Sequence, residues 1–401
     1  MRILIVEEGL RSLKGHFFQY LSDLKAGATA AGHDVTIICH SSADDEITSS
    51  LGAIPLLRRS ALDEPRAVGA IGRVRQIASH NKSFSTDLSG WLDTQDTPFD
   101  LTVFTSFRLE HIWGISSLLD GKAAGKLGKV AALLIESQAV RKQNNNYDFS
   151  RSTIPLRASL RHIGNKASSK HLFFGAESPQ MARQLKLFSG HDFFDVPHVT
   201  EMPHGVSSPR WSGDGPLVFA TYGFTRFDKG LDILQSALLE LTDEAIYTCH
   251  FILQWVKDYS LPDGSMVTKN ESLEKRQNIE FIGRYDDSGS YYRDLARTHV
   301  IILPYRQNFY RDRMSRVAVD AAILGIPVIY PEGTWLSDFV SSEAAGVSFQ
   351  SEDPASLAAA IQEACAHYPD LAKQAETRAE SVRRNFSART FFERLKEATH
   401  C

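Results

Sequence analysis

Short apolar runs alternate with amphipathic segments along the first half of the chain. An apolar run at residues 2–6 is followed by a polar loop, by a segment with helical spacing of apolar residues at 16–32, and by a second run at 34–39. This order predicts a strand, a helix and a second strand parallel to the first. Further runs begin at Leu101, Lys129 and Leu172. The pattern predicts a doubly wound domain, in which helices cover both faces of a parallel sheet.

The same alternation starts again after a segment rich in turn-forming residues. Residues 205–216 hold Gly, Ser or Pro at eight of twelve positions, which is typical of a linker. Beyond it, new apolar runs begin at Leu217, Tyr247, Ile279, His299, Ile326 and Gly346. We therefore expect a first α/β domain over residues 1–204 and a second over 217–385. Ser387 is a suitable N-cap for a last helix.

Composition and charge narrow the class of protein. The chain has 401 residues, of which 43% are hydrophobic and 23% charged, as in folded proteins of two domains. A net charge of −4 argues against a whole-protein electrostatic contact with nucleic acid. The four cysteines lie far apart, and no run approaches the roughly 20 apolar residues that span a bilayer. We therefore expect a cytoplasmic protein with no nucleic-acid partner.

The sequence lacks the motifs of several classes of nucleotide-dependent enzymes and hydrolases. Neither G-x-G-x-x-G nor Walker A spacing is present, since Gly9 and Gly15 stand alone in the first loop. Hydride transfer and ATP hydrolysis are therefore disfavoured. The sequence also lacks G-x-S-x-G, H-E-x-x-H and a D-x-D that could hold a metal on a nucleotide diphosphate. We expect chemistry that needs neither a metal ion nor a bound cofactor.

The segment YGFTRFDKGLDIL, residues 222–234, places two cations in a loop between a strand and a helix. Open α/β sheets bind ligands at the carboxyl ends of their strands. Arg226 with its planar fork and Lys229 with its compact charge suit a diphosphate at that position. The alternative is a solvated surface loop, because basic residues are common in turns.

A second polar segment, residues 304–333, contains Asp312 and Asp320 around the start of a predicted helix. Their spacing of eight residues places both on one face if both lie on the helix. Asp312, with Arg313 and Ser315, would then present polar groups to a sugar and a phosphate, and Asp320 would contact a ribose. The alternative is an acid that favours the helix dipole together with a partly buried aspartate.

These two segments resemble motifs of the large retaining glycosyltransferase group 1, whose members have the GT-B fold. The loop at 222–234 resembles the family's glycine- and lysine-containing loop, IEFIGRY resembles a following strand, and DRMSRVAVDAAILGIPVI resembles its paired-glutamate element. Weaker similarity is found in KGHFFQY, in AGHDVTII and at His204-Gly205-Val206, which matches a crossing between the domains. The resemblance implies an α/β protein with two Rossmann-like, doubly wound parallel-sheet domains that face a central cleft. It also implies that residues 386–401 pack back on the first, acceptor-side domain.

The resemblance also implies a set of site residues. Those expected to act in catalysis are Asp312, Arg226, Lys229 and His16, which follows Gly15 in a loop expected to face the cleft. Those expected to hold the nucleotide sugar are Gly223, Arg226, Lys229, Gly283, Arg284, Arg313, Ser315 and Asp320. Two of them depart from the family: both motif glutamates are aspartates here, which moves each carboxylate by about 1 Å. Where the family often has an acceptor-side histidine, this chain has LLIESQ.

The implied activity is transfer of a sugar from a nucleotide sugar to an acceptor hydroxyl with retention of configuration, in polysaccharide or glycoconjugate synthesis. This would be a metal-independent, hexosyltransferase-like enzyme whose acceptor is a glycan, a lipid-linked group or a small molecule. One alternative is a weak or silent relative that binds a nucleotide sugar or a protein partner. Another is an epimerase or phosphorylase on the same fold, although no signal for a phosphorylase cofactor lysine is found.

One basic stretch stands apart from these motifs. Residues 141–170 carry a net charge of +6, with apolar residues interleaved. Such a stretch suits a peripheral contact with an anionic membrane at its inner face, or with a pyrophosphate-linked lipid. A solvated surface is the alternative interpretation.

Overall fold

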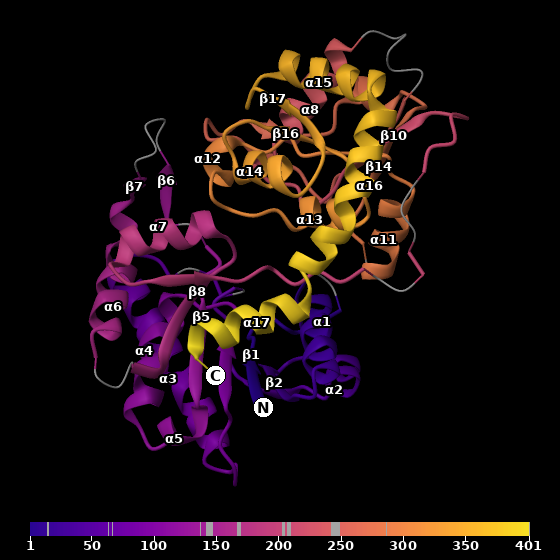
Figure 1. Ribbon diagram of the computed structural model, residues 1–401. Helices are drawn as coiled ribbons and strands as arrows, with labels where there is room; N and C mark the ends of the chain where they lie inside the picture. Colours follow the sequence, from indigo (N-terminus) through magenta and orange to yellow (C-terminus); the bar gives the residue numbers. More distant parts are fainter. Residues whose placement is uncertain are drawn as a thin grey trace. The chain divides into compact units, whose positions relative to one another are not determined.

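The computed structural model divides the chain into two compact units (Figure 1). It describes residues 1–13, 16–62, 64–65, 67–136, 138–141, 147–166, 170–202, 205–206, 210–241, 249–285 and 287–400. Unit 1 comprises Met1–Val199 and Ser387–Cys401, and unit 2 comprises Thr200–Phe386. The expected domains were 1–204 and 217–385; residues 200–204 and the expected linker 205–216 both belong to unit 2.

Unit 1 contains a seven-stranded parallel sheet with the order β3-β2-β1-β4-β5-β8-β9. The strands are β1 (Arg2–Val6), β2 (Asp34–His40), β3 (Ile54–Leu57), β4 (Leu101–Phe104), β5 (Lys129–Leu133), β8 (Leu172–Ala176) and β9 (Phe193–Asp195). Every apolar run predicted in this half forms one of these strands. The order changes direction between β1 and β4, so that the loops after these two strands lie side by side.

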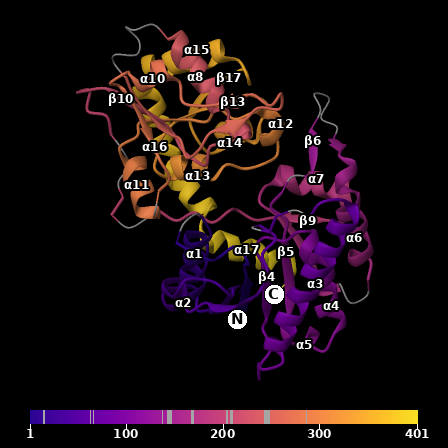
Figure 2. The same ribbon diagram turned by 180° about the vertical axis from the view of Figure 1, so that it is seen from behind.

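Helices cover both faces of this sheet, because alternate strand residues point to opposite sides. Leu4 and Val6 pack with α3 (Ala70–Leu92), α4 (Leu109–Asp120), α6 (Ile154–Gly164) and α7 (Pro179–Ser189). Ile3 and Ile5 pack with α1 (His16–Ala30), α2 (Asp45–Leu51) and α17 (Ala388–Thr399). Both views show α3 and α4 side by side (Figures 1 and 2). The shorter elements are α5 (Ala124–Leu127), η1 (Arg151–Thr153) and the hairpin β6 (Ala139–Arg141) and β7 (Tyr147–Phe149).

The last helix, α17, completes the second of these faces. Ser387 caps it, and the Ser387 hydroxyl accepts a hydrogen bond from the backbone N–H of Thr390, as predicted. Phe391 and Leu395 are fully buried against α1 and the sheet. A Cβ atom at Gly27 of α1 would collide with Ala388, so glycine permits this close approach of the two helices.

Unit 2 contains a six-stranded parallel sheet with the order β14-β11-β10-β15-β16-β17. The strands are β10 (Leu217–Thr221), β11 (Cys249–Gln254), β14 (Ile279–Ile282), β15 (Val300–Ile302), β16 (Val328–Pro331) and β17 (Gly346–Phe349). α8 (Leu231–Glu240) and α15 (Pro354–Ala366) cover one face. The other face is covered by α11 (Ser288–Ala296), α13 (Arg316–Ile323), α14 (Trp335–Ser342) and α16 (Tyr368–Asn385). The shorter elements are η3 (Phe227–Lys229), β12 (Tyr259–Ser260), β13 (Met266–Val267), α10 (Glu271–Glu274) and α12 (Gln307–Tyr310).

Candidate functional site

The order of strands in unit 2 changes direction between its neighbouring strands β10 and β15. The loops that follow these strands therefore meet at the carboxyl edge of the sheet, where open α/β sheets bind ligands. Gly230 lies against the carbonyl oxygen of Pro304, so a Cβ atom at this position would collide with the second loop. Its φ of 66° also favours glycine. The two segments singled out in the sequence thus form one site.

Cations gather around a single carboxylate at this site. Asp228 Oδ2 lies 2.9 Å from Arg226 Nη2 and 3.7 Å from Arg313 Nη1. The hydroxyl of Tyr310 donates a hydrogen bond to the same oxygen at 3.3 Å. The side chains of Arg226 and Arg313 remain 45% and 41% exposed, so both retain N–H groups for a ligand. Together with Lys229, the cluster has more positive than negative charge, as a diphosphate site requires.

Lys229 is held against aromatic rings. Its Nζ atom lies 3.8 Å from the ring centre of Tyr305 and 5.0 Å from that of Tyr310. Among the residues that the structure describes, no carboxylate lies within 4 Å of this nitrogen. Burial lowers the pKa of Lys229 well below its usual value; Asp228 opposes this shift, and Arg226 and Arg313 add to it. A bound dianion would raise the pKa again and draw a proton onto Lys229.

Gln254, at the end of β11, fixes the positions of two loops. Its Oε1 atom accepts a hydrogen bond from the backbone N–H of Gly223 at 2.7 Å. Its Nε2 atom donates to the carbonyl oxygen of Gly283 at 3.0 Å. Gly223 also lies beside the end of the Lys229 side chain. The loops after β10 and β14 are therefore joined at the same edge, with Gly283 and Arg284 exposed.

The structure corrects one part of the sequence interpretation. Asp312 and Asp320 do not lie on one helix, because α13 begins only at Arg316. Ser315 is extended and caps this helix, accepting a hydrogen bond from the backbone N–H of Ala318. Asp312 is buried in the non-helical segment before the cap. The Ser315 hydroxyl lies 3.2 Å from that of Tyr305, next to Lys229.

Asp320 belongs to a separate buried cluster within unit 2. Its carboxylate accepts hydrogen bonds from the hydroxyls of Tyr291, at 2.9 Å, and Tyr292, at 3.2 Å. Arg316 Nε lies 3.0 Å from Asp320 Oδ1. Burial and the Asp320 charge raise the pKa of Tyr291 well above its usual value, so this hydroxyl stays protonated and donates. The ribose contact expected of Asp320 remains a prediction.

The remaining expected site residues lie partly outside the described structure. His16 is the first residue of α1 in unit 1. Its side chain and the preceding Gly15 are outside the described residues, as is His204 of the expected crossing. Their expected roles stay predictions.

Unit 1 has its own change of strand order, and Glu7 lies there. Glu7 directly follows β1 and is buried at the carboxyl edge of the sheet. Its carboxylate accepts hydrogen bonds at 2.7 Å from the hydroxyls of Thr105 and Ser106, which follow β4, and from the backbone N–H of Gly9. Burial raises the pKa of Glu7 although these hydrogen bonds oppose the shift.

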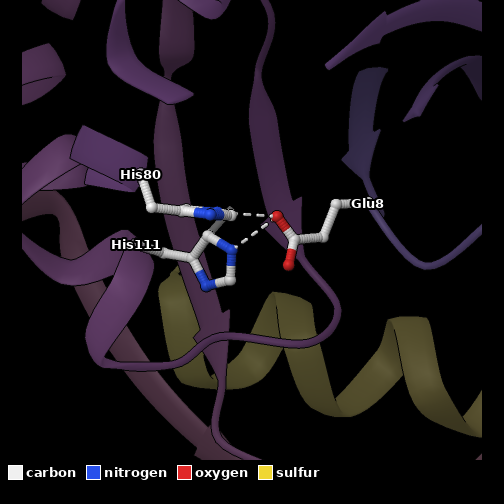
Figure 3. A group of neighbouring side chains, drawn as sticks. All are labelled: Glu8, His80 and His111. Carbon is white, nitrogen blue, oxygen red and sulfur yellow. Dashed lines mark hydrogen bonds and ion pairs between the residues drawn. The ribbon is translucent and has the colours of Figure 1, made fainter. Parts of the chain in front are cut away.

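The neighbouring Glu8 points to two buried histidines (Figure 3). Its Oε2 atom lies 3.0 Å from Nε2 of His80, on α3, and 2.9 Å from Nε2 of His111, on α4. Its Oε1 atom accepts a hydrogen bond from the backbone N–H of Ala61. Burial opposes ionisation of Glu8, but His111 and His80 hold its pKa well below the usual range.

These three side chains have spacing that could also hold a metal ion. Zinc ligation by a histidine nitrogen needs a lone pair on that nitrogen. The backbone N–H of Arg108 donates to His111 Nδ1 at 3.1 Å, so the proton of this ring lies on Nε2, the atom that faces Glu8, and Nε2 has no lone pair for a metal. The observed arrangement therefore suits a hydrogen bond between Glu8 and His80 and a close contact between Glu8 and His111, which join the end of β1 to α3 and α4.

Sequence reasoning missed several of these residues. Two acids directly after the first apolar run were a signal for Glu7 and Glu8, and Asp228 stands between the two predicted cations. Tyr305 and Tyr310 lie in a segment that was singled out for its charged residues and Ser315, not for its tyrosines. For Gln254 and His80, the sequence offers no comparable signal, because their partners come from distant segments. His111 stood out only as a histidine near a predicted sheet edge, which favoured a structural role.

Comparisons with known proteins agree with the two-sheet architecture. Residues 217–367 match the family model described as Glycosyl transferases group 1. No curated protein matches the chain in sequence. Among solved structures, sucrose-phosphate synthase from Thermosynechococcus elongatus is similar with a TM-score of 0.66 and 15% identity, over 99% of this chain and 98% of that one.

Two further similar structures were determined with nucleotides. The Anabaena protein HepE in complex with UDP and glucose has a TM-score of 0.61 and 12% identity, over 99% of this chain and 98% of that chain. The catalytic domain of starch synthase IV from Arabidopsis thaliana, bound to ADP and acarbose, has a TM-score of 0.62 and 12% identity, over 100% of this chain and 99% of that chain. The chain thus has the GT-B fold, and the resemblance to group 1 glycosyltransferases is confirmed. Within the described ranges, no helix has the length and apolar content needed to cross a bilayer.

Proposed function

We propose that the chain is a glycosyltransferase that moves a sugar from a nucleotide sugar to an acceptor hydroxyl with retention of configuration. The observation that carries this proposal is the cluster of Arg226, Lys229 and Arg313 where the loops after β10 and β15 meet. The match of residues 217–367 to group 1 glycosyltransferases supports it. The UDP and ADP in similar structures support a nucleotide-linked donor.

In this proposal the donor diphosphate lies against the three cations. The bond between the anomeric carbon and the diphosphate breaks, and the negative charge that develops on the leaving oxygen is stabilised by the Arg forks and the Lys ammonium. The acceptor oxygen bonds to the same carbon on the same face of the sugar. Its proton passes to the leaving phosphate, so no protein base is required. Asp312 is proposed to contact the sugar and Asp320 the ribose.

We further propose that the cations replace a divalent metal at the diphosphate. Transfer should then continue in EDTA, with no gain on addition of Mg²⁺. Complete loss of activity in EDTA that Mg²⁺ restores would contradict this part of the proposal. The assignment of the donor site would not be affected.

The central experiment compares Lys229→Ala with the parent protein by calorimetric titration of UDP and ADP. Loss of a charged hydrogen bond should weaken binding by roughly 1.5–3 kcal/mol. The parent should also take up protons on binding, because the dianion raises the lowered pKa of Lys229, and the variant should not. Titration in buffers of different ionisation enthalpy measures this uptake.

A matched control is Lys275→Ala, which removes an exposed lysine of the same unit after α10. The control should bind like the parent. Equal affinity and equal proton uptake in Lys229→Ala and the parent would remove Lys229 from the site.

The second candidate function is a weak or silent relative that binds the nucleotide sugar without transfer. The aspartates at both motif positions favour a weak or silent relative, because each side chain is one methylene shorter than the family's glutamate. Turnover by the parent that Asp312→Asn abolishes, with nucleotide affinity retained, would exclude this candidate. Nucleotide binding without turnover for any acceptor would support it.

The acceptor is proposed to be a glycan, a small molecule or a lipid-linked group, and the protein to work in the cytoplasm. A contact of residues 141–170 with the inner face of a membrane is part of this proposal. The structure reduces the charge available for it, since Lys166 pairs with Asp120 at 2.8 Å. Arg161 keeps its charge but is turned to the carbonyl oxygen of Ser189. Lys142 and the Arg141 side chain lie outside the described residues.

A further inference from the structure

Unit 1 carries an apolar hollow on the face formed by α3, α4 and α6. Its volume is about 490 Å³. The apolar side chains that line it are Val74, Ile77, Ala78, Leu109, Trp113 and Pro155. The hollow belongs to unit 1 alone and is separate from the cation cluster of unit 2.

Several polar groups in the lining already have hydrogen-bond partners within the protein. Trp113 Nε1 donates to the Ser159 hydroxyl at 3.0 Å. Asn81 donates to the carbonyl oxygens of Ile77 and Leu109 and accepts from the backbone N–H of Gly114. These paired groups offer a sugar or a nucleotide few further hydrogen bonds. A hydrocarbon needs none, so the hollow suits an apolar occupant.

Large apolar side chains are exposed around this hollow. Ile71 is 71% exposed, Val74 66%, Ile154 58% and Trp113 42%. Val68, just before α3, is 97% exposed. An exposed apolar patch of this kind on a folded unit marks a site of interaction. Trp in addition suits a membrane interface, because its ring is apolar and its N–H is polar.

Cations accompany the apolar side chains. Arg75 and Lys82 lie on α3 at helical spacing from Ile71 and Ala78, and Arg151 lies one turn before Pro155. Within the described residues, no carboxylate lies within 4 Å of these three side chains. Glu110, at the start of α4, is paired with Arg73. The face therefore combines apolar side chains with unpaired positive charge, which complements an anionic bilayer.

The exposed apolar side chains of this face lie near the carboxyl edge of the first sheet. Val68, Ile71 and Val74 lie at the N-terminal end of α3, Trp113 in the first turns of α4, and Ile154 at the start of α6. Helices α3 and α4 are the next helices along the chain after β3 and β4, so their first turns lie toward the carboxyl edge of the sheet. Glu7, Thr105 and Ser106 lie at the same edge.

We propose that this face of unit 1, defined by Ile71, Val74, Trp113 and Ile154 with Arg75 and Lys82, docks on an anionic phospholipid bilayer. The exposed apolar side chains enter the bilayer surface, the hollow receives lipid hydrocarbon, and the cations face lipid headgroups. The inference deepens the proposed function, on which it rests for one consequence: the acceptor is lipid-linked and reaches the carboxyl edge of the first sheet from the membrane.

The test is co-sedimentation of the full chain with vesicles of phosphatidylcholine alone or mixed equally with phosphatidylglycerol. Salt is set at about 50 mM and about 500 mM, because high salt screens headgroup attraction. The parent should bind the anionic vesicles at low salt. Two double variants, Ile71→Ser with Val74→Ser and Arg75→Glu with Lys82→Glu, should each reduce partitioning by roughly tenfold or more. All four positions are at the surface, so folding should be preserved, and circular dichroism checks this.

Matched controls carry similar changes away from this face. Leu187→Ser removes an exposed apolar side chain near the far end of α7, and Lys275→Glu with Lys373→Glu reverses two exposed charges in unit 2. Both should bind like the parent.

Phospholipids brominated along their chains should quench tryptophan fluorescence in the parent and in Trp211→Phe, but much less in Trp113→Phe.

Several outcomes would overturn the proposal. They are a parent that does not sediment with anionic vesicles, binding that neither double variant reduces, and quenching that Trp113→Phe does not change. Concentration-dependent dimerisation without vesicle binding, lost in Ile71→Ser with Val74→Ser, would assign the face to a second copy instead. Nucleotide binding to unit 2 is measured separately, so failure of the docking test is distinguishable from failure of the proposed glycosyl transfer.

Discussion

At the scale of single residues, adjacent carboxyl groups experience opposite environments. Glu7 is surrounded by neutral hydroxyls, and its burial raises its pKa. Glu8 lies between His80 and His111, which hold its pKa well below the usual range. Neutral donors only partly replace water around a buried charge, whereas imidazole groups can offset it. Because the pKa of Glu7 is raised and that of Glu8 is lowered, the two residues change stability with pH in opposite directions.

For Glu7→Gln we expect stability relative to the parent to increase with pH. A raised folded-state pKa means that Glu7 contributes stability fully below the ordinary value of about 4.3, and that this contribution is lost as pH rises through the folded-state pKa. Glutamine does not titrate, so its contribution to stability does not change with pH. Urea unfolding of both proteins at several values between about pH 4 and about pH 8 measures the difference. Glu46→Gln, on the exposed side of α2, is the control; a difference for Glu7→Gln that does not change with pH would count against the raised pKa.

For Asp320→Ala we expect a loss of about 3–5 kcal/mol in the free energy of unfolding, because Arg316, whose side chain is only 18% exposed, would lose its charged partner. Tyr291 and Tyr292 would lose their acceptor as well. Asp370→Ala, at an exposed position of α16, should change stability by less than about 1 kcal/mol. Urea unfolding gives the stability and calorimetry gives the UDP affinity. An unchanged stability of Asp320→Ala would contradict the structural role, and weaker UDP binding by the folded variant would support the proposed ribose contact as well.

At the scale of elements, most strands of the two sheets were predicted, whereas the edge strands β3 and β9 and some helices were not. The predicted strands are short apolar runs, because a strand buried on both faces needs no alternation. β3 and β9 are short and only partly buried, so they leave a weaker signal in the sequence. The helix α3 was not predicted, since buried His80 and Asn81 interrupt its apolar pattern and are accommodated only by distant partners. The basic stretch was predicted as one amphipathic surface, yet it forms β7, η1 and α6, with separate contacts for its cations.

For Phe391→Ala in α17 we expect a loss of about 3–5 kcal/mol, the usual cost of replacing a fully buried phenylalanine. The loss should fall on unit 1, because Phe391 packs with α1 and the first sheet. Arg389→Ala, which removes only an exposed pair with Glu393, should cost less than about 1 kcal/mol. Calorimetric unfolding measures both variants, and an unchanged melting temperature for Phe391→Ala would refute the packing of α17.

At the scale of the whole molecule, the sequence predicted two α/β domains but not the internal chemistry of each. Linkers and apolar runs are local features of the chain. The clusters around Asp228 and Glu8 join segments that are far apart in sequence, as the pairing of Asp228 with Arg313 and of Glu8 with His111 shows. Arg226 and Lys229 were identified because both lie in one short loop.

We expect UDP to stabilise one unit and not the other. If unit 2 alone holds the nucleotide, a concentration of about 100 times the dissociation constant adds about 2.7 kcal/mol to its stability. Scanning calorimetry should then show that UDP raises the unit 2 transition. Phe391→Ala lowers the unit 1 transition and so identifies it. A UDP-dependent rise in the transition that Phe391→Ala lowers would place the nucleotide site elsewhere.

Unit 1 is built from two separate parts of the chain, Met1–Val199 and Ser387–Cys401, which are synthesised at different times. Its sheet is encoded before unit 2, but α17 is encoded after it, so the ribosome completes unit 2 before it supplies the helix that covers one face of the first sheet. Until then Ile3, Ile5 and their neighbours lack the apolar partners Phe391 and Leu395. Nascent chains that end near residue 386 should therefore carry a folded unit 2 beside an exposed apolar face, which is a surface that chaperones recognise.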